Sequence, residues 1–221
     1  LAGVVAAQVR AGPASRARGA AMTLAEAAAA VVVGIATADR LIDGGADLVV
    51  GGDMGIGNTT PSAALIAHFT DADATAVTGP GAGLPPEAMA AKRAIVADAA
   101  HRVENEADPL VVLAEIGGLE IAALAGLYLG AAARRVPVVI DGVIALAAAT
   151  VATAFAPALP DRLIAGHRST EPAATVALHA LGLDPVLDLD LRLGEGTGAC
   201  LAVPVIAGAA AAMGEMADLP T

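Results

Sequence analysis

The architecture of this chain is inferred from the segment Gly51-Gly52-Asp53-Met54-Gly55-Ile56-Gly57-Asn58-Thr59-Thr60, which directly follows the apolar run Ala46–Val50. This order predicts a buried strand that runs into a glycine-rich turn, which in turn opens a helix. Parallel α/β proteins use such turns to bring main-chain N–H groups up to a phosphate, because glycine permits close approach. A tight strand-to-helix corner without a ligand is the alternative interpretation.

The polar residues of the same segment add chemistry to the predicted turn. Asn58, Thr59 and Thr60 supply side-chain donors and are candidates to cap the helix. Asp53 places one carboxylate at the mouth of the predicted site. The segment therefore predicts an anion-binding turn with one acidic group beside it.

Further strands are expected on the C-terminal side of this turn. Val136–Ile140, Leu163–Ala165 and Pro185–Leu189 are short apolar runs, and helix-like segments separate them. The alternation predicts a single α/β domain over residues 1–221, Rossmann-like, with a mostly parallel sheet covered by helices on both faces. Ligands of such sheets bind at the carboxyl edge of the strands, where we expect the site.

Several helix boundaries are marked in the sequence. Thr23 with Glu26 three residues later predicts a capping box, and that helix should end near Asp43, before two glycines. Helices are also expected from about Thr59, from Pro85-Pro86-Glu87 and from Leu119, and Asp108 is expected to cap a short helix.

Composition excludes several classes of protein. The 221 residues are 57% hydrophobic, and the single cysteine, Cys200, excludes an internal disulfide framework and a cysteine-based zinc site. The net charge of −11 and the 1% aromatic content argue against a nucleic-acid partner. A single thiol fits a reducing compartment, and we expect a cytoplasmic protein.

Two segments raise questions of location. The long uncharged run Gly142–Pro160 is rich in alanine and ends in prolines, so we interpret it as a buried helix and expect no membrane partner. The chain begins at Leu1, and Arg10, Arg16 and Arg18 stand near its start without an acidic residue. This resembles a transit peptide, but we favour an internal piece of a longer chain.

Two charged residues are candidates for chemistry. Glu195 lies between Gly194 and Gly196, so it can approach a ligand closely, and we expect desolvation to raise its basicity. The alternative is a solvated loop glutamate. Lys92 is the one lysine of the chain and follows a glycine-rich loop, so it could reach a phosphate; an exposed helix lysine is the alternative.

Polar clusters follow the later predicted strands. His167, Arg168, Ser169 and Thr170 suit phosphate or ribose recognition, or they cap the helix that starts at Pro172. The run Gly196–Gly198 could supply N–H donors to an anion. Asp184, Asp188 and Asp190 offer only a weak metal site. Asp188 and Asp190 alternate along the expected last strand, so we interpret them as polar positions at the strand end. No serine or cysteine stands in a nucleophile elbow.

Five motifs in family order make the chain resemble the nicotinate-nucleotide–dimethylbenzimidazole phosphoribosyltransferase family of the cobalamin pathway. They are Gly52–Thr60, Gly117–Leu124, Val139–Gly142, Gly166–Ser169 and Arg192–Gly198. The resemblance implies transfer of phosphoribose from nicotinate mononucleotide to 5,6-dimethylbenzimidazole, without a metal or cofactor. It gives α-ribazole 5′-phosphate and nicotinate.

The resemblance also implies roles for particular residues. Glu195 matches the family's general base, and Leu193 and Gly194 match residues of the same pocket. Asp53 matches an active-site acid that is usually glutamate. Phosphate and ribose recognition would fall to Gly55, Gly57, Asn58, Thr59, Thr60, Lys92 and Ser169.

The resemblance leaves some alternatives open. Family members carry an additional N-terminal segment and form dimers, so we expect a homodimer and a chain that lacks part of the benzimidazole pocket. A phosphoribosyltransferase that uses an activated ribose diphosphate with magnesium is a second enzyme class. A non-catalytic nucleotide-binding domain, or a truncated relative that keeps only the phosphate pocket, is the non-enzymatic alternative, and a membrane transporter is the last.

Overall fold

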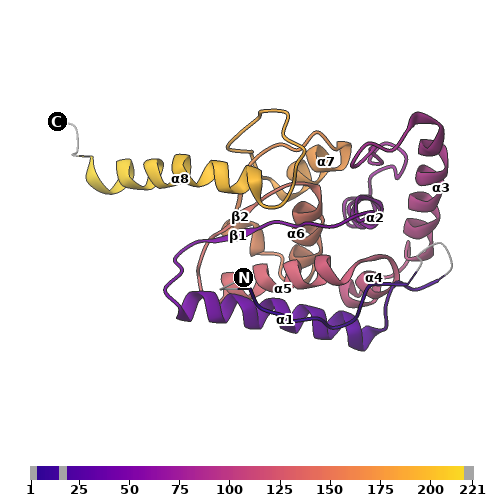
Figure 1. Cartoon of the computed structure of the whole chain (residues 1–221), viewed down its shortest axis with the longest axis horizontal. Coiled ribbons are helices and arrows are strands. Elements are labelled where there is room, and N and C mark those ends of the chain that lie inside the picture. Colours follow the sequence, from indigo (N-terminus) through magenta and orange to yellow (C-terminus); the bar gives the residue numbers. More distant parts are fainter. Residues whose placement is uncertain (1–3, 15–18, 217–221) are drawn as a thin grey trace.

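The computed structural model describes residues 4–14 and 19–216, so Leu1, Arg16 and Arg18 lie outside the described residues (Figure 1). A parallel sheet of three short strands lies at its centre, in the order β1 (Val49–Gly51), β2 (Val138–Ile140), β3 (Leu163–Ala165). The surrounding helices are α1 (Leu24–Asp43), α2 (Thr59–Thr70), α3 (Pro86–Arg102), α4 (Pro109–Ile116), α5 (Leu119–Ala133), α6 (Val143–Phe155), the 3-10 helix η1 (Leu159–Arg162), α7 (Pro172–Leu181) and α8 (Thr197–Glu215).

The two faces of the sheet contact different helices, as the sequence predicts. Alternate strand residues such as Val138 and Ile140 belong to the main core with α5 and α6. Val139 between them packs against Ala199 and Ala202 of α8. Figure 1 shows α8 on one side of the strands and α1 and α5 on the other. The alternation of side chains along a strand therefore assigns each face to its own layer of helices.

Small residues allow α1 and α5 to pack along most of their length. A methyl group at Gly34 would overlap the carbonyl oxygen of Ala123, and one at Gly126 would overlap that of Val31. The backbones of the two helices are therefore in direct contact. This contact gives the alanine-rich sequence of both helices a packing role, because larger side chains would separate them.

Most predicted boundaries are confirmed, and one strand is wrong. Thr23 and Glu26 form the expected capping box: Thr23 N donates to Glu26 Oε2 at 2.8 Å, and Glu26 N donates to Thr23 Oγ1 at 3.2 Å. The expected strand Pro185–Leu189 is reduced to one parallel bridge, between His167 and Leu187. Pro185 has no N–H to donate, and Asp190 takes a left-handed conformation that turns the chain away.

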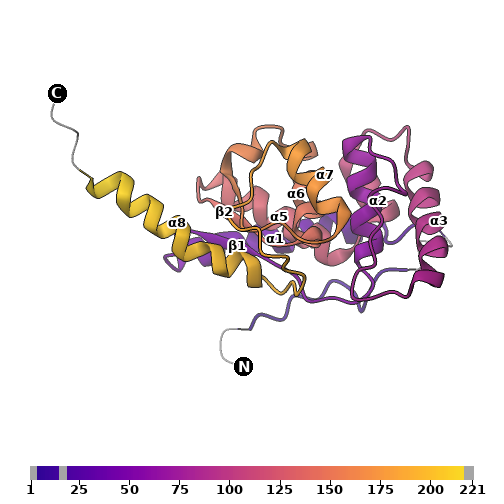
Figure 2. The ribbon, with the colours of Figure 1, turned by 90° about the horizontal axis from the view of Figure 1, so that it is seen from above.

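The apolar run Gly142–Pro160 forms the buried helix α6, as expected. The helix α8 has an exposed apolar surface instead, and it projects from the body with its C-terminal half free of other elements (Figure 2). Only 17% of its apolar stretch is buried, and Leu201 and Val205 are exposed. Within the described ranges, α8 is the one helix whose length and composition would suffice to cross a membrane.

Candidate active site

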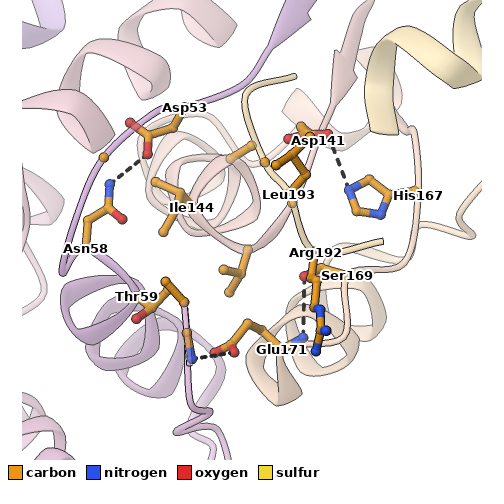
Figure 3. Close-up of a pocket in the computed structure, with 17 residues that line it drawn as sticks. Asp53, Asn58, Thr59, Asp141, Ile144, His167, Ser169, Glu171, Arg192 and Leu193 are labelled. Carbon is orange, nitrogen blue, oxygen red and sulfur yellow. Dashed lines mark hydrogen bonds and ion pairs between the residues drawn. The ribbon is translucent and has the colours of Figure 1, made fainter. Parts of the chain in front are cut away.

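A cavity of about 130 Å³ lies at the carboxyl ends of the three strands (Figure 3). Asp53 follows β1, Asp141 follows β2, and His167 and Ser169 follow β3; the loop from Arg192 to Gly194 closes one side. The expected position at the carboxyl edge is thus observed. Parallel strands bring these polar groups together although they are far apart in sequence.

The glycine-rich turn after β1 presents unused donors. In the part of the chain that the structure describes, no main-chain N–H of residues 53–57 donates a hydrogen bond to protein. Asn58 occupies the N-cap of α2 but makes no capping bond, so the capping role expected of it is wrong. Its Nδ2 donates to Asp53 Oδ2 at 2.7 Å, so the side chain is directed toward the carboxylate rather than toward the N–H groups of α2. The free N–H groups and the start of α2 suit an anion.

Asp53 is half-buried beside these donors. Desolvation by burial raises the pKa of its carboxyl above the usual value, and the hydrogen bond from Asn58 opposes that rise. Burial thus favours the protonated form of Asp53 more than water would. A raised pKa in a cavity is typical of functional carboxyls.

The predicted substrate-binding residues divide between this cavity and an adjoining groove of about 590 Å³. The cavity is lined by Gly55, Asn58, Thr59, Ser169, Leu193 and Gly194, and the groove by Gly57, Thr59, Thr60 and Lys92. Thr59 borders both spaces. The cavity is smaller than ordinary ligand pockets of roughly 300 Å³ or more. A ligand larger than the cavity would therefore extend past Thr59 into the groove.

Lys92 joins two loops at this boundary. Its residue is only 8% exposed, which excludes the exposed helix lysine that the sequence allowed. Nζ donates to the Gly79 carbonyl at 2.6 Å and to Thr59 Oγ1 at 2.9 Å. Burial lowers the pKa of Lys92, while the charge of Glu171 opposes that change. Glu171 also accepts a hydrogen bond from Gly81 N at 2.7 Å, a contact that no sequence motif had indicated.

Glu195 differs from its prediction in one respect. Its side chain is exposed and does not line the cavity, so the expected desolvation is wrong for this structure. The flanking glycines bring the backbone close to β1 but have no side chains with which to cover the carboxylate. The Glu195 N–H donates to the Asp53 carbonyl at 2.8 Å. Its backbone is left-handed, with φ of 61°.

Asp141 and His167 form a buried pair beneath the same loop. Each side chain is 2% exposed, and His167 Nε2 lies 3.3 Å from Asp141 Oδ1 (Figure 3). Asp141 accepts hydrogen bonds from Gly196 N and Ala199 N, both at 3.1 Å. Burial alone would raise the pKa of Asp141, but His167 and the two N–H groups together hold it below its usual value.

This pair changes the interpretation of the second glycine run. The predicted donors of Gly196–Gly198 do meet an anion, but at Gly196 that anion is the chain's own Asp141 carboxylate. In the sequence, Asp141 was only part of the Val139–Gly142 motif and had no assigned role. Its position directly after a β-branched strand was the available signal.

The charged residues outside the cavity do not form a metal centre. Within residues 4–14 and 19–216, no group of three or more His, Cys, Asp or Glu side chains is arranged to hold a metal ion. Asp188, which was considered as a ligand, accepts from Arg168 Nε at 3.0 Å on the surface. Its charge is thus used in an exposed ion pair.

Comparison with known proteins gives consistent matches. A family model described as phosphoribosyltransferase matches residues 2–220. A nicotinate-nucleotide–dimethylbenzimidazole phosphoribosyltransferase from Salinispora tropica is 57% identical over 97% of this chain and 59% of its own length. An enzyme of the same name from Desulforudis audaxviator is 49% identical over 97% of this chain and 61% of its own.

A solved structure has the same fold. The crystal structure of CobT from Thermus thermophilus superposes with a TM-score of 0.92 at 47% identity, covering 95% of this chain and 63% of that one. The chain thus spans about three fifths of the length of the curated relatives it matches.

Proposed function

The chain belongs to the phosphoribosyltransferase family, and on that basis we propose that it transfers phosphoribose from nicotinate mononucleotide to 5,6-dimethylbenzimidazole. The products are α-ribazole 5′-phosphate and nicotinate. The observation that carries the proposal is that relatives of this name are 48–57% identical over 95–97% of the chain. The cavity supports it with a chemistry of binding and charge rather than of covalent catalysis.

The free N–H groups of residues 53–57 and the start of α2 are assigned to the phosphate. Thr59 and Thr60 add hydroxyl donors there, and Lys92 adds a cation at the boundary of cavity and groove. Gly55, Gly57 and Asn58 complete this side, and Ser169 is assigned to the ribose from the opposite wall. Phosphate bound far from the reacting carbon would fix the ribose, so that its binding energy orients C1′.

One nitrogen of dimethylbenzimidazole attacks C1′, and the bond from C1′ to the nicotinate nitrogen breaks. The electron pair of that bond returns to the pyridinium nitrogen, which makes nicotinate a neutral-ring leaving group. The N–H proton of the attacking base passes to the Glu195 carboxylate. Asp53 stabilises the positive charge that develops on the ribose, and Leu193 and Gly194 border the aromatic base.

The exposure of Glu195 favours one second candidate function. Because the Glu195 carboxylate does not line the cavity, it has no bound aromatic base to deprotonate in this arrangement. A protein that keeps the phosphate site without turnover would bind nicotinate mononucleotide and leave it intact. Tight binding without nicotinate release would distinguish this candidate from the enzyme.

The test measures nicotinate release from nicotinate mononucleotide with and without dimethylbenzimidazole. We expect base-dependent release by the native chain and a loss of about 10²-fold or more in Glu195→Gln, the range typical of a lost general base. Glu215→Gln is the matched control, because that carboxylate lies exposed at the far end of α8. Equal rates for Glu195→Gln and the native chain would contradict the assigned base.

The remaining expectations stay predictions. They are a homodimer, a cytoplasmic location and the absence of nucleic-acid and membrane partners. Sedimentation at several protein concentrations tests the first of them.

A further inference from the structure

We propose that Asp141 is a positioning residue for Glu195, with its carboxylate holding the turn that presents the general base. The inference rests on the proposed function in its assignment of Glu195. It goes beyond that function because it gives a role to Asp141, at the end of β2. Asp141 accepts a hydrogen bond from Gly196 N, fifty-five positions later in the chain.

The turn around Glu195 has an unusual backbone. Gly194, Glu195 and Gly196 all have positive φ, at 78°, 61° and 77°. Glycine adopts this conformation freely, but glutamate does so only where its surroundings hold it there. The direction of the Glu195 side chain is therefore set by contacts of the turn rather than by its own preference.

Three contacts hold the turn on the sheet. The Glu195 N–H donates to the Asp53 carbonyl at 2.8 Å. Gly196 packs so closely on Gly52 that a methyl group at Gly52 would overlap the main chain of Gly196. These two contacts involve main chain only. The third is the Asp141 carboxylate, which binds Gly196 N through Oδ2 and Ala199 N through Oδ1. Among the described residues, Asp141 is thus the side chain that hydrogen-bonds the main chain of this segment.

His167 makes the buried charge of Asp141 tolerable. A buried carboxylate is costly unless polar groups and hydrogen-bond donors surround it. The His167 ring lies 3.3 Å away and packs directly on Gly198, at the start of α8. The pair therefore contacts Gly196, Gly198 and Ala199 of this segment. Both carboxylate oxygens face main-chain donors, so Asp141 acts through the turn.

The decisive variant is Asp141→Asn, which keeps the shape of the side chain. An amide has one acceptor oxygen, so one of the two N–H groups must face its NH₂ group and lose its partner. We expect kcat for nicotinate release to fall by about tenfold or more, with the KM for nicotinate mononucleotide changed less than about threefold. Asp188→Asn is the matched control, since its carboxylate pairs with Arg168 at the surface.

A double-mutant cycle tests whether the effect passes through Glu195. In the Glu195→Gln background, Asp141→Asn should cost less than about threefold more, because the base it positions is already absent. A full additional loss would overturn the proposal, and so would equal effects of Asp141→Asn and Asp188→Asn. A merely structural role would reduce activity in both backgrounds alike.

Amide exchange supplies a readout that needs no turnover. We expect the Gly196 and Ala199 amides to exchange about tenfold faster in Asp141→Asn, while amides of α2 stay unchanged. Unchanged exchange would overturn the proposal even if the chain were active. A native chain that releases no nicotinate would refute the proposed function, and exchange would still decide the role of Asp141. His167→Gln, tested in the same way, replaces Asp141→Asn if that variant does not fold.

Discussion

The molecule contains two glycine-rich turns that resemble each other in sequence and differ in what their donors bind. In the turn after β1, the N–H groups of residues 53–57 are unused within the described chain, and Ile56 is 99% exposed. In the turn before α8, the N–H groups of Glu195, Gly196 and Ala199 all bind groups of the protein. The first turn is free to bind a ligand, whereas the second is a fixed support for one side chain.

The largest expected effect comes from adding a methyl group to the fixed turn. Gly198→Ala places Cβ in overlap with the His167 ring, whose side chain is only 2% exposed. We expect the free energy of unfolding to fall by about 3 kcal/mol. Gly57→Ala is the comparison in the open turn, where no atom lies within 4 Å and only its φ of 78° opposes alanine. That variant should lose roughly 1 kcal/mol.

Urea denaturation of both variants measures the difference. Gly208→Ala serves as a control within α8, because its position is also open and its backbone is helical. A gain of about 0.5 to 1 kcal/mol is expected there, since alanine favours a helix. If Gly198→Ala and Gly57→Ala were equally destabilised, the two turns would not differ in packing as described.

The second effect concerns the carboxylate of the fixed turn. The pKa of Asp141 is lowered in the folded protein, so its contribution to stability is present above the unfolded value of about 3.9 and is lost as pH falls through the folded value. We expect Asp141→Asn to lose about 2 kcal/mol near pH 7, typical of hydrogen bonds to a charged group. Denaturation between pH 7 and 3 should show a smaller acid-induced loss in the variant than in the native chain.

Much of this arrangement follows from local sequence signals. Thr23 and Glu26 predicted the start of α1, and Val138–Ile140 and Leu163–Ala165 lie within the runs that predicted strands. The glycines predicted a turn at the carboxyl edge of the sheet. Each of these features depends on residues close in sequence, so their chemistry is visible without the fold.

The differences arose where distant segments meet. Asn58 donates to Asp53 rather than capping α2, and Asp141 binds an N–H fifty-five positions away. The exposure of Glu195 depends on which segments cover it, as does that of α8. A glycine run shows that donors can approach an anion, but a partner elsewhere in the chain determines whether those donors remain free.

The smallest expected effect has the opposite sign to that of Asp141. Burial raises the pKa of Asp53, with the Asn58 hydrogen bond in opposition, so ionisation destabilises the folded state. Stability from this group therefore falls as pH rises from the unfolded pKa through the folded one. Asp53→Asn should gain about 0.5 kcal/mol near pH 7, a small value because the half-exposed charge is screened by water. The variant's amide oxygen can still accept from Asn58.

Denaturation of native, Asp53→Asn and Asp141→Asn chains at pH 3 and pH 7 compares the two turns directly. Between these values, Asp53→Asn in the turn after β1 should stabilise the fold more as pH rises. Asp141→Asn beneath the turn before α8 should destabilise the fold more over the same interval. Parallel pH dependence of the two variants would mean that both carboxylates have similar surroundings. Opposite slopes would assign the destabilising charge to the ligand side of the cavity and the stabilising charge to the support beneath Glu195.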